Sequence, residues 1–162
     1  MAERAVVNAS PLMFLSKAGL IELLRVVAPQ IVVPEPVAQE IARRGPEDIT
    51  AKALASVPWL TAIAATPVPS LIQSWDLGAG ESAVLAHALA NSGMIAIIGD
   101  GMGRRCAEAL GIALSGTLGL VMLAKQRGVI SAARPVIAAL KQHGMFLSEQ
   151  TIDRAMALVG EV

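Results

Sequence analysis

The sequence of 162 residues has no tyrosine, two phenylalanines, two tryptophans and a single cysteine. So few aromatic rings argue against an RNA-binding surface of the RRM or OB type, and we expect no exposed aromatic side chain for base stacking. The lone Cys106 excludes an internal disulfide and a cysteine zinc site, and it is typical of the reducing cytoplasm. With only two histidines, any bound metal is expected to have oxygen ligands, which favours Mg²⁺ or Mn²⁺.

An excess of charge of one sign is also lacking, because thirteen Lys and Arg balance thirteen Asp and Glu. A contact with nucleic acid must therefore come from a local basic patch. No apolar run approaches the ~20 residues needed to cross a bilayer, and the N-terminus shows no signal-peptide pattern, so no membrane partner is expected. With 54% hydrophobic and 16% charged residues, the chain is expected to fold as one domain over residues 1–162.

Short aliphatic runs, by contrast, are abundant and alternate with helical patterns. The runs typical of buried strands occupy residues 5–7, 31–33, 60–64, 95–98 and 112–114. The helical patterns occupy residues 10–24 with a break at Gly19, 34–44, 47–57, 80–91, 101–110, 117–128, 135–143 and 149–159, and residues 66–70 form a connection. This alternation predicts the α/β class, a three-layer α/β/α sandwich with a mostly parallel sheet of about five strands.

The first candidate site residue is Asp100, which follows the aliphatic run 95–98 and stands in a glycine-rich turn. A carboxylate at the C-terminal end of a buried strand lies where open α/β sheets place their sites. Asp100 could instead cap the next helix. A dinucleotide-binding loop is a third interpretation, but Gly103 comes one place too early for the spacing G-x-G-x-x-G.

Two glutamates are further candidates. Glu81 lies in the first turn of its helix, where the helix dipole favours a carboxylate, and it shares an apolar face with Leu85 and Leu89. It is therefore expected to point inward, where a carboxylate needs a partner such as a cation. Glu40 could pair with Arg44 one turn later, or it could lie at the edge of the buried face of its helix.

Several polar residues at the ends of the predicted strands and helices complete the set. Asn8 ends the first strand, where its side chain could cap the next helix, ligate a cation or hold a water. Ser10 and Thr117 each open a helix, so capping is their default role. Arg104 and Arg105 are either solvated helix residues or, beside a metal site, ligands for a phosphate.

Five motifs then occur in order: V-V-N-A-S-P-L at 6–12, V-P-E-P-V-A-Q-E-I at 33–41, L-G-A-G-E-S-A at 77–83, I-I-G-D-G-M-G-R-R at 97–105 and G-T-L-G-L at 116–120. Together they resemble the PIN-domain family, in its branch of VapC-like nucleases. The resemblance covers about residues 5–158. It implies a sandwich similar to 5′-nucleases that cleaves single-stranded RNA with Mg²⁺ or Mn²⁺ held by an acidic cluster.

By matching motif, the resemblance makes Glu40, Glu81 and Asp100 the catalytic and metal-binding acids. Asn8 falls on a catalytic position where the family usually has Asp, and Gly99 replaces the first acid of an Asp-Asp pair. With fewer acids, one metal ion is expected rather than two. Ser10, Arg104, Arg105 and Thr117 would contact the substrate.

The resemblance implies a metal-dependent ribonuclease, the toxin of a toxin–antitoxin system, whose partners are single-stranded RNA and an antitoxin protein. The alternative is a catalytically degenerate PIN-like domain that binds RNA or a partner protein without cleavage, since two acids are missing. The apolar, charge-poor composition also predicts a homodimer or larger homo-oligomer, formed through the C-terminal helices by Leu140, Phe146, Leu147 and Leu158.

Overall fold

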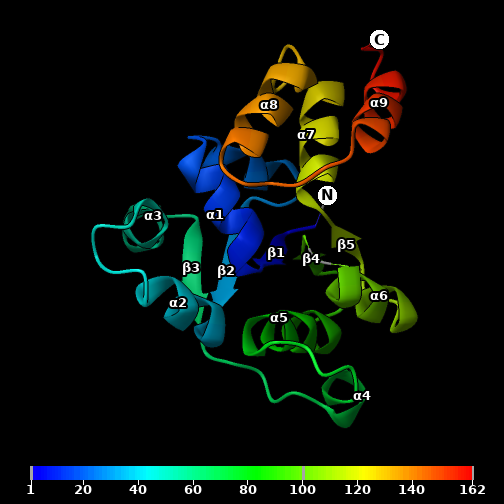
Figure 1. Cartoon of the computed structure of the whole chain (residues 1–162). Coiled ribbons are helices and arrows are strands. Elements are labelled where there is room, and N and C mark those ends of the chain that lie inside the picture. Colours follow the sequence, from blue (N-terminus) through cyan, green and yellow to red (C-terminus); the bar gives the residue numbers. More distant parts are fainter. Residues whose placement is uncertain (1, 100, 162) are drawn as a thin grey trace.

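The computed structural model describes residues 2–99 and 101–161, and its described strands form one parallel sheet (Figure 1). The strands are β1 (Arg4–Val7), β2 (Gln30–Pro34), β3 (Leu60–Ile63), β4 (Ile95–Ile97) and β5 (Leu114–Ser115). Their spatial order is β3-β2-β1-β4-β5. The inner strands are almost fully buried because helices cover both faces, which explains why their sequences are continuous aliphatic runs.

Helices surround this sheet in two layers. They are α1 (Ala9–Lys17), the 3₁₀-helix η1 (Ile21–Val26), α2 (Glu35–Ala42), α3 (Ile49–Ser56), α4 (Ser70–Gln73), α5 (Ala79–Ala90), α6 (Gly101–Ala109), α7 (Thr117–Gln126), α8 (Ala133–Gln142) and α9 (Glu149–Leu158). In Figure 1, α4 and α5 lie below the strands, and α1, α7 and α8 lie above them. The predicted α/β/α sandwich is confirmed. None of the described helices is long and apolar enough to cross a membrane.

The predicted elements agree with the structure except at three places. The leucine pattern after Gly19 forms a 3₁₀-helix, because the chain turns at Gly19, whose φ is 71°. The connection at 66–70 leads into the short helix α4, which the sequence did not predict and which is held by the buried Ile72. The fifth strand begins at Leu114, two residues later than expected.

The C-terminal helices only partly present the apolar surface expected for an oligomer. Leu140 is fully buried and therefore belongs to the core, so it cannot contact a second subunit. Leu158 is 72% exposed and Phe146 is 89% exposed. The expectation that the chain has no exposed aromatic side chain is therefore wrong.

The strand order places a crevice between β1 and β4. From β1 the chain extends the sheet through β2 to β3 on one side, and β4 and β5 extend it on the other. Parallel α/β sheets bind ligands at the carboxyl ends of two such strands, because the connections leaving them diverge. Asn8 directly follows β1, and its backbone N–H donates to the carbonyl oxygen of Ile97 in β4 at 3.0 Å. The sheet therefore places Asn8 at this crevice.

Candidate functional site

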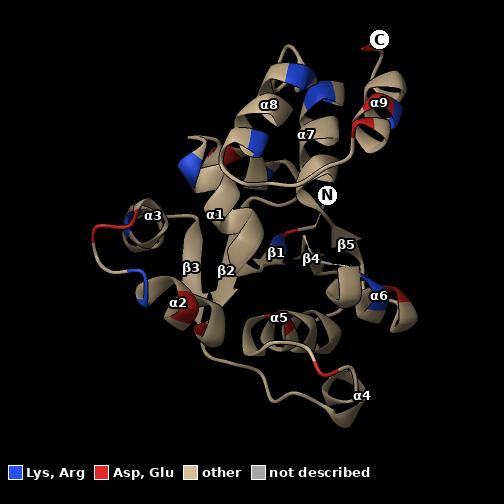
Figure 2. Ribbon diagram, viewed as in Figure 1, with Lys and Arg blue, Asp and Glu red and all other residues tan. Residues whose placement is uncertain are grey.

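A small polar pocket of about 260 Å³ lies at this edge of the sheet. It gathers four of the predicted site residues from three helices and a strand end: Asn8, Ser10, Glu40 and Glu81. Figure 2 shows acidic residues on α2 and α5, which pack against each other, and basic residues on α6. Asp100 lies outside the described residues.

Asn8 is buried, with 6% of its surface exposed. It occupies the N-cap position of α1, but its side chain makes no capping hydrogen bond, so the capping interpretation is wrong. Its Oδ1 atom lies 3.2 Å from the point where a Cβ at Gly80 would stand, and Oε2 of Glu40 lies 3.3 Å from the same point. The two oxygens therefore share the space above Gly80.

Glu40 is exposed on α2 and lines the pocket. Its predicted ion pair with Arg44 is absent, because the Arg44 guanidinium instead binds Asp48 at 3.0 Å. Among the described residues, none makes a hydrogen bond or ion pair with the Glu40 carboxylate. Glu40 is thus available to a ligand of the pocket.

Glu81 lies in the first turn of α5, half-buried between the pocket and α6. Its Oε2 atom is 2.9 Å from the point where a Cβ at Gly103 would stand, so the carboxylate lies directly against α6. Leu85, one turn later, is fully buried as predicted, whereas Leu89 is 40% exposed. The inward direction predicted for Glu81 agrees with this placement.

The other predicted substrate-binding residues separate into two groups. Ser10, Arg104 and Thr117 line a second, larger pocket of about 690 Å³, and Ser10 lines both pockets. Neither hydroxyl residue is an N-cap, because Asn8 and Gly116 hold those positions.

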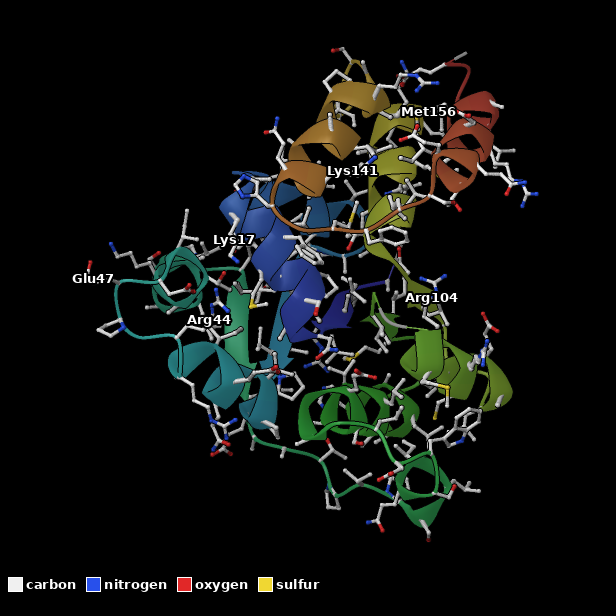
Figure 3. All side chains as sticks on the ribbon, viewed as in Figure 1. Lys17, Arg44, Glu47, Arg104, Lys141 and Met156 are labelled. Carbon is white, nitrogen blue, oxygen red and sulfur yellow. The ribbon has the colours of Figure 1, made fainter. Side chains whose placement is uncertain are left out.

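Arg104 and its neighbour Arg105 differ in placement. The Arg104 guanidinium, labelled in Figure 3, donates a long hydrogen bond of 3.5 Å to the Ile98 carbonyl oxygen. Arg105 is exposed, with Nη1 4.0 Å from the sulfur of Met102, and it lines neither pocket. The structure therefore brings only Arg104 of this pair to the site.

Three motif glycines explain how these side chains fit. Gly80 leaves room for Asn8 and Glu40, and Gly103 leaves room for Glu81. A Cβ at Gly116 would overlap Nη1 of Arg104. Of the glycines that suggested a nucleotide loop in the sequence, Gly103 thus makes space for a site side chain, and it lies within α6.

The donor set of the polar pocket suits a hard divalent cation. Asn8, Glu40 and Glu81 offer amide and carboxylate oxygens, which Mg²⁺ and Mn²⁺ prefer. Among residues 2–99 and 101–161, no three His, Cys, Asp or Glu side chains lie close enough together to hold an ion. Of the three predicted acids, two are in the described part of the chain, so the fit rests on their oxygens together with that of Asn8.

Arg43 also lines the polar pocket, and no pattern in the sequence singled it out. It is exposed at the C-cap of α2, three residues after Glu40, and so lies on the same side of that helix. The i, i+3 spacing from a candidate acid is the signal that could have identified it. Arg43 and Arg104 place a cation beside each pocket, which suits a ligand with several phosphates.

A protein-family model described as a PIN domain matches residues 4–161. The chain belongs to the PIN-domain family. PIN domains are generally nucleases and typically use divalent metal ions, so the polar pocket lies in a nuclease-type fold. No curated protein matches the chain.

Proposed function

We propose that this PIN domain is a metal-dependent endoribonuclease that cleaves single-stranded RNA. The observation that supports it is the polar pocket at the carboxyl end of β1, where Asn8, Glu40 and Glu81 converge from different elements. Because the chain carries no net positive charge, the phosphate backbone of the RNA would be bound by local cations, and Arg43 and Arg104 line the two pockets.

Glu81 and Asp100 would hold a Mg²⁺ or Mn²⁺ ion, with Glu40 binding through water. When bound, the ion would lower the pKa of a water and offset charge on the phosphodiester oxygens. Glu40 would orient the attacking water and accept its proton, since its carboxylate faces the pocket without a partner among the described residues. The Asn8 amide would hydrogen-bond a water in the pocket. Arg104 would bind a neighbouring phosphate.

The test is cleavage of a fluorescent single-stranded RNA with Mn²⁺. Asp100→Asn and Glu81→Gln should each reduce the cleavage rate by at least about 100-fold, because each removes charge from the metal site. Glu108→Gln is the matched control, since Glu108 is an exposed acid of α6 that lines neither pocket. No cleavage by the wild type with any divalent ion, together with no calorimetric signal for Mn²⁺ binding, would refute the proposal.

The alternative is a degenerate domain that binds RNA without cleavage, and the neutral Asn8 at a buried position of the pocket favours it. Asn8→Asp separates the two functions. An active wild type supports the nuclease. If the wild type binds RNA without cleaving it and the Asn8→Asp variant does cleave it, the degenerate domain is supported.

The cellular role is a further part of the proposal. The resemblance of the motifs to VapC-like nucleases supports a toxin neutralised by an antitoxin, and the single cysteine is consistent with the cytoplasm. Induced expression should arrest growth, and Asp100→Asn should abolish the arrest; equal toxicity of the two would contradict this role. The apolar, charge-poor composition supports a homodimer or larger homo-oligomer, which light scattering at micromolar concentration would detect.

A further inference from the structure

The larger pocket combines an apolar lining with a single cation. Both phenylalanines of the chain, Phe14 and Phe146, line it. Arg104 is the one charged residue among the described residues that line it. Phe146 is 89% exposed, the highest value among the large hydrophobic side chains that are exposed in the described part of the chain. An apolar ring left this open to solvent beside a pocket points to a ligand.

The larger pocket lies next to the polar pocket. Ser10 lines both, and Gly99, the residue before Asp100, lines the larger one. In Figure 1 the segment between α8 and α9 passes beside the start of α7, and these two segments supply much of the lining. A polymer bound in the polar pocket could therefore extend past Ser10 into the larger pocket, which Arg104 and Phe146 line.

We infer that the larger pocket binds one unpaired base of the RNA, next to the phosphodiester that the proposed nuclease cleaves. The base stacks on Phe146, and Arg104 binds a phosphate attached to the same nucleotide. Single-stranded nucleic acids are bound by this combination of an aromatic face and a nearby cation. This inference rests on the proposed function.

The chemistry of the lining favours a nucleotide over an apolar peptide. A nucleotide brings a flat apolar face and a negative charge together, which matches an apolar lining with one guanidinium. The volume of about 690 Å³ falls in the range of small-molecule sites. Met122 and Met145 supply adaptable side chains, so the pocket should accept any of the four bases.

Binding of a fluorescent single-stranded hexaribonucleotide, with the metal chelated so that no cleavage occurs, tests the inference. Phe146→Ala should weaken binding roughly 5- to 100-fold, the loss expected for one stacked base. Phe146→Trp should restore it. Leu71→Ala is the matched control, because Leu71 is 64% exposed on α4 and lines neither pocket.

A series of hexanucleotides that each lack one base identifies the contact. With the wild type, removing the base at one position of the RNA should weaken binding by the same factor as Phe146→Ala does with the intact RNA. With the Phe146→Ala variant, removing that same base should weaken binding no further. Unchanged binding by Phe146→Ala would overturn the inference, while cleavage with Mn²⁺ would leave the nuclease proposal standing. If Phe146→Ala weakens binding equally for the intact RNA and for every abasic RNA, Phe146 contacts no base and the inference is overturned. A wild type that binds no RNA in the chelator would overturn the inference, and cleavage with Mn²⁺ would decide the nuclease proposal separately.

Discussion

Replacing Gly80 by alanine should change stability and metal affinity in opposite directions. Gly80 is in the first turn of α5 and has a helical backbone without a positive φ. Glycine in a helix is less favourable than alanine by about 0.5–1 kcal/mol, so the substitution stabilises the helix. The new Cβ would stand 3.2 Å from Oδ1 of Asn8 and 3.3 Å from Oε2 of Glu40.

These close contacts decide how the pocket responds. Asn8 is buried and cannot move far, whereas the exposed Glu40 carboxylate can swing outward. Displacing Glu40 by a few tenths of an ångström relieves its own contact but moves the carboxylate away from the water through which it would bind the ion. We expect Mn²⁺ affinity to fall roughly 10- to 100-fold, as for substitutions beside metal ligands. The melting temperature without metal should rise by less than the roughly 4 °C that the helix gain alone would give, because the contact with the buried Asn8 remains.

Calorimetric titration with Mn²⁺ and thermal unfolding in a chelator measure the two effects. Gly119→Ala is a matched control, because Gly119 is also helical and its Cβ would stand 3.3 Å from the Ser115 hydroxyl, outside the polar pocket. It should gain stability and bind Mn²⁺ like the wild type. Wild-type Mn²⁺ affinity in Gly80→Ala would refute the idea that this glycine makes room for the ligand oxygens.

Three further predictions concern other contacts. Gly116→Ala should displace the Arg104 guanidinium and weaken binding of single-stranded RNA to the level of Arg104→Ala, measured by fluorescence anisotropy. Thr50→Val should lower the free energy of unfolding by about 0.5–1.5 kcal/mol, because the buried Ser16 hydroxyl, 2.6 Å away, loses this partner and keeps the Met13 carbonyl oxygen at 3.2 Å. In urea denaturation, Ser16→Ala combined with Thr50→Val should cost less than the two single losses together. A hydrogen bond from the arginine one turn earlier lowers the pKa of Asp48, so its stabilising effect should be present above about pH 4 and be lost as the pH falls further. Asp48→Asn should therefore differ from the wild type at pH 6 and approach it near pH 2, and an equal difference at both pH values would contradict this assignment.

Most of the fold was predictable because the strands and helices have strong local signals. The inner strands are unbroken aliphatic runs, and glycine and proline mark where the main helices begin and end. The short helix α4 lacks such a signal, since its four residues are ordered by burying Ile72 rather than by local preference. In the same way, only the packed structure shows that Phe146 points outward while Met145 beside it is buried.

The candidate site was only partly predictable, because its members meet through the topology of the sheet. Motif order identified Asn8, Glu40 and Glu81, and the structure places them around one pocket. The role of the glycines depends on contacts between residues far apart in the sequence, such as Gly80 with Asn8. No local pattern reports such a contact, so the sequence suggested a loop function for Gly103 and no function for Gly80.

The neutral side chain at position 8 has a physical consequence that can be tested. Because Asn8 is buried and its oxygen shares the space above Gly80 with the Glu40 carboxylate, an aspartate there would place two negative charges side by side. Asn8→Asp should therefore be less stable than the wild type without metal, since like charges repel in a poorly solvated site. With Mn²⁺ it should bind at least about tenfold more tightly, which adds about 1.4 kcal/mol of metal-linked stability. A Mn²⁺-induced rise in melting temperature no larger in Asn8→Asp than in the wild type would mean that position 8 does not face the ion.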